Sequence, residues 1–218
     1  MSKLKDLQFF ETENASGNKP DNLVIFLHGY GSNGQDLLSL SHEFAKILPD
    51  AHFISPNAPF DLEIPISFGY QWFSLLSTEP AIIYPKIIQA NNILDKFIQS
   101  QLERFNLEYK DLIMVGFSQG SMMAMYNCLS TKQPAKGVVA YSGRLILPTD
   151  LGEKINSKPR ICLIHGTLDS VVPFDNMLIA KSHLEKLHIP FESHAIEGLE
   201  HSINAKGIAI AKRFMNSL

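Results

Sequence analysis

Short apolar runs rich in β-branched and aromatic residues recur along the chain, and each is bounded by turn-forming residues such as glycine, proline, serine or asparagine. Runs of this length and composition predict β-strands. The expected strands cover Leu23–Leu27, His52–Ser55, Leu112–Gly116, Gly137–Tyr141, Arg160–Ile164 and Phe191–Ile196.

Longer stretches between these runs carry apolar residues at helical spacing. The expected helices cover Leu37–Leu48, Ile87–Leu102, Leu178–Leu187 and Ile203–Leu218. Pro49 and Pro190 end the first and third of them, because proline cannot continue a helix. Pro85 suits the first turn of the second helix, where a proline costs no hydrogen bond, and Asp175 suits the cap of the third.

Strands that alternate with helices predict a mostly parallel sheet covered on both faces, which is a three-layer α/β sandwich. At 218 residues, we expect a single domain over residues 1–218. Leu7–Glu11 suits an edge strand or hairpin. The segment Pro56–Pro80 shows neither period yet is rich in apolar residues, so we expect it to pack over another part of the molecule.

The composition and net charge of the chain argue against some classes of binding partner. The chain is 45% hydrophobic and 19% charged with a formal net charge of −3, which offers no broad attraction for nucleic acid or anionic lipid. The N-terminus lacks the apolar stretch of a secretory signal and no run is long enough to span a membrane, so we expect a cytoplasmic protein. The spacing of Cys128 and Cys162 suggests neither a disulfide nor a metal site, and both suit small buried positions.

Residues 116–121 read GFSQGS and follow the expected strand Leu112–Gly116. A Gly-x-Ser-x-Gly stretch between a strand and a helix makes a sharp turn that lifts the serine oxygen clear of the sheet, and side chains at the glycines would collide with neighbouring elements. Residues 122–126 suit a helix, whose N-terminal amides would add positive potential near that oxygen. This context favours Ser118 as a nucleophile over an ordinary turn serine.

A serine nucleophile needs a base to take its proton and an acid to fix the base, and on this architecture the acid precedes the histidine in sequence. Asp169 lies in HGTLDSVVP, directly after an expected strand, and His201 lies in EGLEHSI, after the last one. Asp175 is the rival acid but suits helix capping, and Asp150 has no strand immediately before it. We therefore expect Asp169 and His201 to complete a catalytic triad.

The other histidines suit structural positions. His28 and His165 both precede a glycine at a strand end, come before the acid in sequence, and suit buried hydrogen-bonding positions. His194 lies within a strand pattern. The remaining histidines show no pairing that resembles metal ligation, so we expect no metal. They are His42, His52, His183 and His188.

The negative oxygen of a tetrahedral intermediate needs amide donors. One is expected from Gln119. The second normally comes from the loop after an early strand, here LHGYGSNG over Leu27–Gly34, where the backbone amide of Tyr30 is the expected donor. An ordinary glycine-rich turn would explain the glycines but not the place of this loop. The loop lacks the dinucleotide fingerprint, so we expect no nucleotide cofactor.

Six motifs occur in the order FLHGYGSNG, PNAP, QWF, GFSQGS, HGTLDSVVP and GLEHS. With them the chain, from about Leu23 to Leu218, resembles the phospholipase/carboxylesterase family of α/β-hydrolases, which includes bacterial carboxylesterases and acyl-protein thioesterases. The resemblance implies a serine hydrolase of carboxylic esters or thioesters that works through an acyl-enzyme, with the triad and oxyanion hole named above. It places Trp72 beside the site. The chain departs from the family pattern at Ser121, where glycine is frequent, and at Ser74, where aspartate is frequent.

The apolar residues around 64–76, together with Val171 and Val172, suit a wall for an acyl chain, although they equally suit residues that only cover the sheet. The expected partner is a small acyl ester or thioester, and the assembly a monomer or homodimer. A protein that keeps the fold and binds a small ligand without turnover is the alternative, and the completeness of the triad argues against it.

Overall fold

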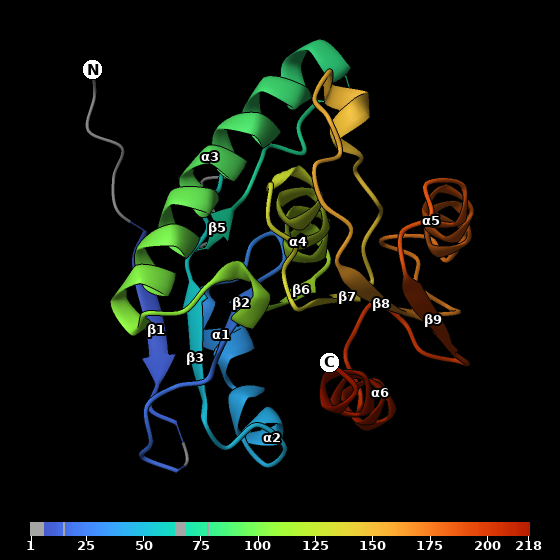
Figure 1. The fold of residues 1–218 in the computed structure, drawn as a ribbon. Helices are drawn as coiled ribbons and strands as arrows, with labels where there is room; N and C mark the ends of the chain where they lie inside the picture. The colour runs from blue at the N-terminus through green and yellow to red at the C-terminus, as the bar shows by residue number, and fades with distance from the viewer. Residues whose placement is uncertain (1–6, 15, 64–68, 78) are drawn as a thin grey trace, which may run out of the picture.

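Seven strands form the central sheet of the computed structural model, in the order β1-β3-β2-β6-β7-β8-β9 (Figure 1). The structure describes residues 7–14, 16–63, 69–77 and 79–218. β1 runs antiparallel to β3, and each other neighbouring pair in the sheet is parallel. A separate antiparallel pair, β4 and β5, lies in the connection between β3 and α3.

The strands are β1 Phe9–Thr12, β2 Asn22–Leu27, β3 Ala51–Pro56, β4 Phe60–Asp61, β5 Tyr70–Gln71, β6 Leu112–Phe117, β7 Gly137–Tyr141, β8 Arg160–Gly166 and β9 Phe191–Ile196. The α-helices are α1 Gly34–Leu38, α2 Ser41–Phe44, α3 Pro80–Phe105, α4 Gln119–Ser130, α5 Asp175–Lys186 and α6 Ala205–Asn216. The 3₁₀ helices are η1 Tyr109–Asp111 and η2 Pro148–Leu151.

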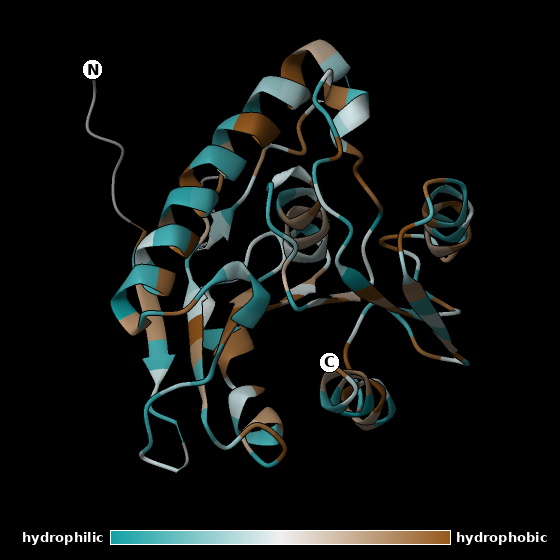
Figure 2. Ribbon diagram, viewed as in Figure 1, coloured by the Kyte–Doolittle hydropathy of each residue, from teal (hydrophilic) through white to brown (hydrophobic). Residues whose placement is uncertain are grey.

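Helices cover both faces of the sheet, as expected for a parallel sheet whose strands are buried on both sides (Figure 1). One core holds buried residues of α3, α4 and α5 against one face. The other core holds buried residues of α1, α2 and α6 against the opposite face. The long helix α3 buries an apolar stripe while its outer side is polar (Figure 2). The expected three-layer α/β sandwich is therefore confirmed.

The six strands expected from the sequence are all present, with ends shifted by no more than two residues. The expected edge strand near the N-terminus is β1. It is fastened to α3 by Arg104, which donates to both carboxylate oxygens of Glu11 at 2.7 and 3.0 Å. This ion pair holds the short edge strand in place.

The helix expected over Leu37–Leu48 is wrong in one respect, because it breaks into α1 and α2. The Ser39 hydroxyl donates to the Asp36 carbonyl at 2.7 Å, and the Leu40 amide bonds the Leu37 carbonyl at 3.1 Å. The Leu40 bond spans three residues, as in a 3₁₀ turn, which is tighter than the α-helix. The Ser39 bond does not by itself break a helix, since Ser100 makes the same bond to Phe97 within the continuous helix α3.

Two expected helix starts also shift. α3 begins at Pro80, so Pro80 occupies the first turn and Pro85 lies inside the helix, where it removes one backbone donor. α5 begins at Asp175 with Phe174 as its cap. Asp175 thus carries its charge in the first turn, near the positive end of the helix dipole, rather than at the cap position.

The apolar segment Pro56–Pro80 is described in part, since residues 64–68 and 78 lie outside the described residues. Trp72 and Phe73 are fully buried, whereas Leu75 and Leu76 are exposed. Across the described part of the chain, none of the helices combines the length and the apolar character that crossing a membrane would need.

Candidate active site

Ser118 lies between β6 and α4, at the carboxyl end of a central strand. It is the N-cap of α4, with φ 53° and ψ −119°, a conformation that a residue with a side chain rarely adopts. The turn is tight on both sides. A Cβ on Gly116 would lie 2.4 Å from the Cα of Ser121, and one on Gly120 would lie 1.9 Å from the carbonyl oxygen of Leu27. Glycine is therefore required at both positions, as the sequence predicts.

Asp169 and His201 meet at the same edge of the sheet. Asp169 follows β8 and His201 follows β9, and these neighbouring parallel strands end side by side. The two side chains form a hydrogen bond of 2.7 Å between His201 Nδ1 and Asp169 Oδ2. The acid and the base expected from the sequence are thus brought together.

The carboxylate of Asp169 is buried and receives several hydrogen bonds. Its Oδ1 accepts from the backbone amides of Val171 and Val172 at 3.0 and 2.8 Å. Burial alone raises the pKa of Asp169, but the hydrogen bonds from His201 and from the two amides outweigh it, and the pKa lies below its usual value. Asp169 is therefore a carboxylate at neutral pH, and it orients the Nδ1 proton of His201.

His165 supports this carboxylate in a way that the sequence did not reveal. The sequence suggested only a buried, hydrogen-bonding histidine there, and His165 is buried. Its Nε2 donates to the carbonyl of Val172 at 2.8 Å and lies 3.3 Å from Asp169 Oδ2. Its position four residues before the acid, at the end of β8, is the signal that could have identified this support.

The loops that carry the acid and the base are bonded to each other. The Thr167 amide donates to the Ile196 carbonyl and the Leu168 amide to the Leu199 carbonyl, both at 3.0 Å, and the Gly198 amide donates to the Thr167 hydroxyl at 3.0 Å. A Cβ on Gly166 would lie 2.2 Å from the Leu199 carbonyl oxygen, so the two loops pack closely. They form one support for the Asp169–His201 pair.

The imidazole of His201 packs beside the serine turn. The ring of Phe117, the residue before Ser118, lies 4.8 Å from the His201 ring, measured between centroids. Among the described residues, the hydrogen bonds of His201 include that to Asp169 and none to the Ser118 hydroxyl. Such nucleophile–base contacts are often long before substrate binds and tighten in the reacting complex.

The loop Leu27–Gly34 lies against Ser118. A Cβ on Gly29 would lie 3.4 Å from the Cβ of Ser118, so the backbone of this loop reaches the serine. Within the described residues, the backbone amides of Tyr30 and Gln119 donate to no protein acceptor. Both expected donors are therefore without a protein acceptor in the described part of the chain.

The three side chains expected to contact substrate lie in different surroundings. Trp72 is fully buried, and its indole N–H donates to the His28 carbonyl at 3.0 Å, so it supports the Leu27–Gly34 loop from beneath rather than lining the site. Val172 is buried beside Asp169. Val171, whose backbone amide bonds Asp169, is 66% exposed.

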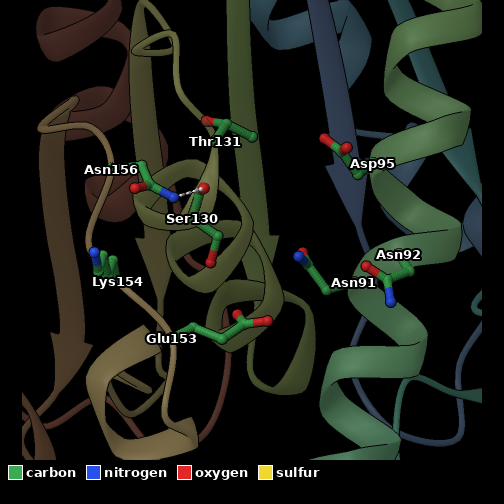
Figure 3. Close-up of a pocket in the computed structure, with 8 residues that line it drawn as sticks. All are labelled: Asn91, Asn92, Asp95, Ser130, Thr131, Glu153, Lys154 and Asn156. Atoms are coloured by element: carbon green, nitrogen blue, oxygen red, sulfur yellow. Dashed lines mark hydrogen bonds between the residues drawn. The ribbon is translucent and has the colours of Figure 1, made fainter.

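A polar pocket of about 390 Å³ lies at the other end of α4 (Figure 3). Residues of α3 face Ser130, Thr131 and the segment 153–156 across it. Asn156 donates to the Ser130 carbonyl at 2.8 Å, and the Tyr109 hydroxyl donates to Asp95 at 2.7 Å. The lining includes no histidine or cysteine, and its two carboxylates, Asp95 and Glu153, accept hydrogen bonds from the hydroxyls of Tyr109 and Tyr126.

One further cluster has ligand types that metals use. Cys162, Glu192 and His194 place their ligand atoms within 4.8 Å of one another on β8 and β9. These groups already bond one another, since Glu192 accepts from His194 at 2.9 Å and from Cys162 at 3.5 Å. Arg213 lies 3.4 Å from His194 Nε2. Mutual hydrogen bonding and the arginine explain the cluster without an ion.

Comparisons with known proteins identify the family of this chain. A family model described as Phospholipase/Carboxylesterase matches residues 10–218. Acyl-protein thioesterase 1 homolog 1 of Dictyostelium discoideum is 27% identical over 205 residues, which cover 88% of each chain. Acyl-protein thioesterase 1 of Saccharomyces cerevisiae is 28% identical over 196 residues, which cover 82% of this chain and 85% of the relative.

Solved structures share the fold. The crystal structure of esterase PE8 matches with a TM-score of 0.89 and 36% identity, covering 98% of this chain and 99% of that one. The Bacillus cereus carboxylesterase, at 17% identity and a TM-score of 0.78, covers 97% of this chain and 94% of its own and shows the fold alone. Because the family model spans nearly the whole sequence, this chain belongs to the phospholipase/carboxylesterase family.

Proposed function

We propose that this chain is a serine hydrolase that cleaves carboxylic esters or thioesters, with Ser118 as nucleophile, His201 as base and Asp169 as the acid that orients the base. The observation that carries the proposal is the 2.7 Å bond between His201 Nδ1 and the buried Asp169 carboxylate, at the edge of the sheet where Ser118 lies. The matched family and the names of its relatives support the same substrate class.

The reaction runs in two steps. Because Asp169 holds the proton on Nδ1, the Nε2 of His201 carries the lone pair that takes the Ser118 proton as the serine oxygen attacks the acyl carbon. The oxygen of the tetrahedral intermediate accepts from the amides of Tyr30 and Gln119. His201 then protonates the leaving alcohol or thiol, and water, activated by the same imidazole, releases the acid from the acyl-serine.

The strained backbone of Ser118 serves the attack. Ser118 has a positive φ at the N-cap of α4, and the residue as a whole is 9% exposed. Strain of this kind persists only where the surrounding packing fixes it, here the contacts at Gly116 and Gly120.

The exposed apolar residues near the site favour an acyl chain over a charged substrate. Leu168 and Val171 flank Asp169, and both are exposed, as are Leu75 and Leu76 after Trp72. A contiguous patch of exposed apolar residues is typical of a ligand-binding surface, and we propose these residues for the wall of an acyl site.

Replacing Ser118 with alanine tests the proposal. Hydrolysis of a short-chain aryl ester should fall to what the remaining site provides, about 10³ to 10⁴ over water. A fluorophosphonate probe should label the wild-type protein and fail to label Ser118→Ala. Ser130→Ala, at the far end of the same helix, is the matched control and should keep both activities.

Labelling that persists in Ser118→Ala would place the nucleophile elsewhere. A wild-type protein that neither hydrolyses the ester nor takes up the probe would instead indicate a ligand-binding protein on this fold.

A further inference from the structure

The segment Tyr70–Phe73 is hydrogen-bonded to the loop that carries the Tyr30 amide. The Gly31 amide donates to the Tyr70 carbonyl and the Tyr70 amide donates to the Ser32 carbonyl, both at 2.9 Å. The Trp72 indole adds its bond of 3.0 Å to the His28 carbonyl. These bonds lie on both sides of Tyr30 in sequence, so they fix the direction in which its amide points.

The side chain of Gln119 forms hydrogen bonds that connect the same segment to the serine turn. Gln119 Oε1 accepts from the Trp72 backbone amide at 2.8 Å, and Gln119 Nε2 donates to the Phe73 carbonyl at 2.7 Å. The side chain is almost fully buried, and both bonds are made in the interior. Buried amide bonds of this kind are costly to break, because the partner left behind has no water to bond.

His28 holds the other end of the loop. Its Nε2 accepts from the Ala58 amide at 2.9 Å, so the ring is neutral and its Nδ1 carries the proton that it donates to the Gly29 carbonyl at 2.7 Å. Burial lowers the pKa of His28 to about 4, which agrees with this neutral form. The loop is thereby fixed from both ends.

We propose that the side chain of Gln119 is a positioning group for the oxyanion hole: through Trp72 and Phe73 it sets the distance between the amides of Tyr30 and Gln119. The inference rests on the proposed function, because it assigns a role toward the intermediate of that reaction. It also gives the Tyr70–Phe73 segment, which has no helical or strand period, a defined place in catalysis.

A role in positioning differs measurably from a role in folding alone. The two amides bind the charge that develops in the transition state, so their spacing affects kcat and leaves the binding of the ground-state ester nearly unchanged. A boronic acid, which adds to the serine as a tetrahedral anion, should lose affinity in parallel with kcat/KM. A variant that only loosens the fold would change the unfolding temperature without this pattern.

The experiment uses two substitutions of Gln119. Gln119→Met keeps the length of the side chain and removes both hydrogen bonds. It should lower kcat for the aryl ester by about 10- to 100-fold, since an error of about 1 Å in a catalytic contact has an effect of this order, while KM changes little. Gln101→Met is the matched control, because Gln101 is also a buried glutamine but lies on α3, where it bonds Ser100 and Arg104. It should leave kcat unchanged.

Gln119→Glu supplies a second readout, which remains informative if the methionine variant does not fold. A protonated carboxyl has the shape of the amide, accepts from Trp72 and donates to Phe73, whereas the ionised form cannot donate. The ratio of its kcat to that of the wild type should therefore be highest at low pH and fall as the carboxyl ionises.

The result that would overturn the inference is a folded Gln119→Met with wild-type kcat and boronic acid affinity, or a Gln119→Glu ratio that does not depend on pH. Either result would leave the proposed function standing, provided that the wild type is active and labelled at Ser118. Loss of activity only in Ser118→Ala would thus support the triad and reject the positioning role.

Discussion

Replacing Asp169 with asparagine is a sharp test of the triad, because the structure dictates how the new amide would lie. Asp169 Oδ1 accepts from two backbone amides, those of Val171 and Val172, so the carbonyl oxygen of the asparagine must take that place. Its NH₂ group then faces His201 Nδ1, which Asp169 Oδ2 now contacts at 2.7 Å. Two donors cannot share one bond, so the imidazole would move its proton to Nε2.

That tautomer cannot accept the proton of Ser118. We expect kcat for an aryl ester near neutral pH to fall by about 10⁴-fold, the loss associated with this change in a serine protease triad, while the fold is kept. The assay is the steady-state rate beside that of Asp175→Asn, the rival acid, which is exposed in the first turn of α5 and should keep wild-type activity. An Asp169→Asn protein with more than about a tenth of the wild-type kcat would refute the reasoning, since no such rate fits the wrong tautomer.

The stability of the fold should depend on pH through the ionisation of Asp169. Its pKa is lowered in the folded protein, so the stability that it contributes is present above its unfolded value of 3.8 and is lost as the pH falls through the lower folded value. The wild type should therefore unfold at a higher temperature than Asp169→Asn at neutral pH, and this difference should shrink in acid.

Two further predictions concern the loop beside the serine. The pKa of His28 is about 4 in the folded protein and 6.5 as the reference value, so the unfolded chain takes up the proton at a higher pH than the folded protein does. The free energy of unfolding, measured with urea, should therefore fall by about 3 kcal/mol in the wild type as the pH falls from about 7 to 4. His28→Gln should lack this loss. Gly120→Ala places a Cβ 1.9 Å from the Leu27 carbonyl oxygen and should lower kcat by about 100-fold, whereas unchanged kinetics would mean that the turn yields without cost.

The fold was largely predictable, because its strands are apolar runs and its helices are periodic. The six expected strands of the sandwich are buried, and buried strands are visible in the sequence as apolar runs. The errors lie where a local bond competes with periodicity. A 3₁₀-type backbone bond at Leu40 interrupts a helix whose apolar spacing continues, and Pro85 stands in a helix that begins one turn earlier at Pro80.

For the candidate site, the sequence predicted the three side chains but not the hydrogen bonds that support them. Ser118, Asp169 and His201 each follow a strand end, and the parallel order of the strands carries them to one edge. The supporting bonds of Gln119 and Trp72 had no such signal, because they join side chains to the backbone of segments about 45 residues away that have no period of their own. His165 had a partial signal in its position four residues before Asp169, at the end of β8.

The acid and base depend on bonds between the ends of β8 and β9, whereas the Tyr30 loop depends on a segment inserted between β3 and α3. The Asp169–His201 pair and the Tyr30 loop are therefore held by separate stretches of polypeptide. A change in the Tyr70–Phe73 segment would therefore disturb the Tyr30 loop and leave the bonds that hold the Asp169–His201 pair intact.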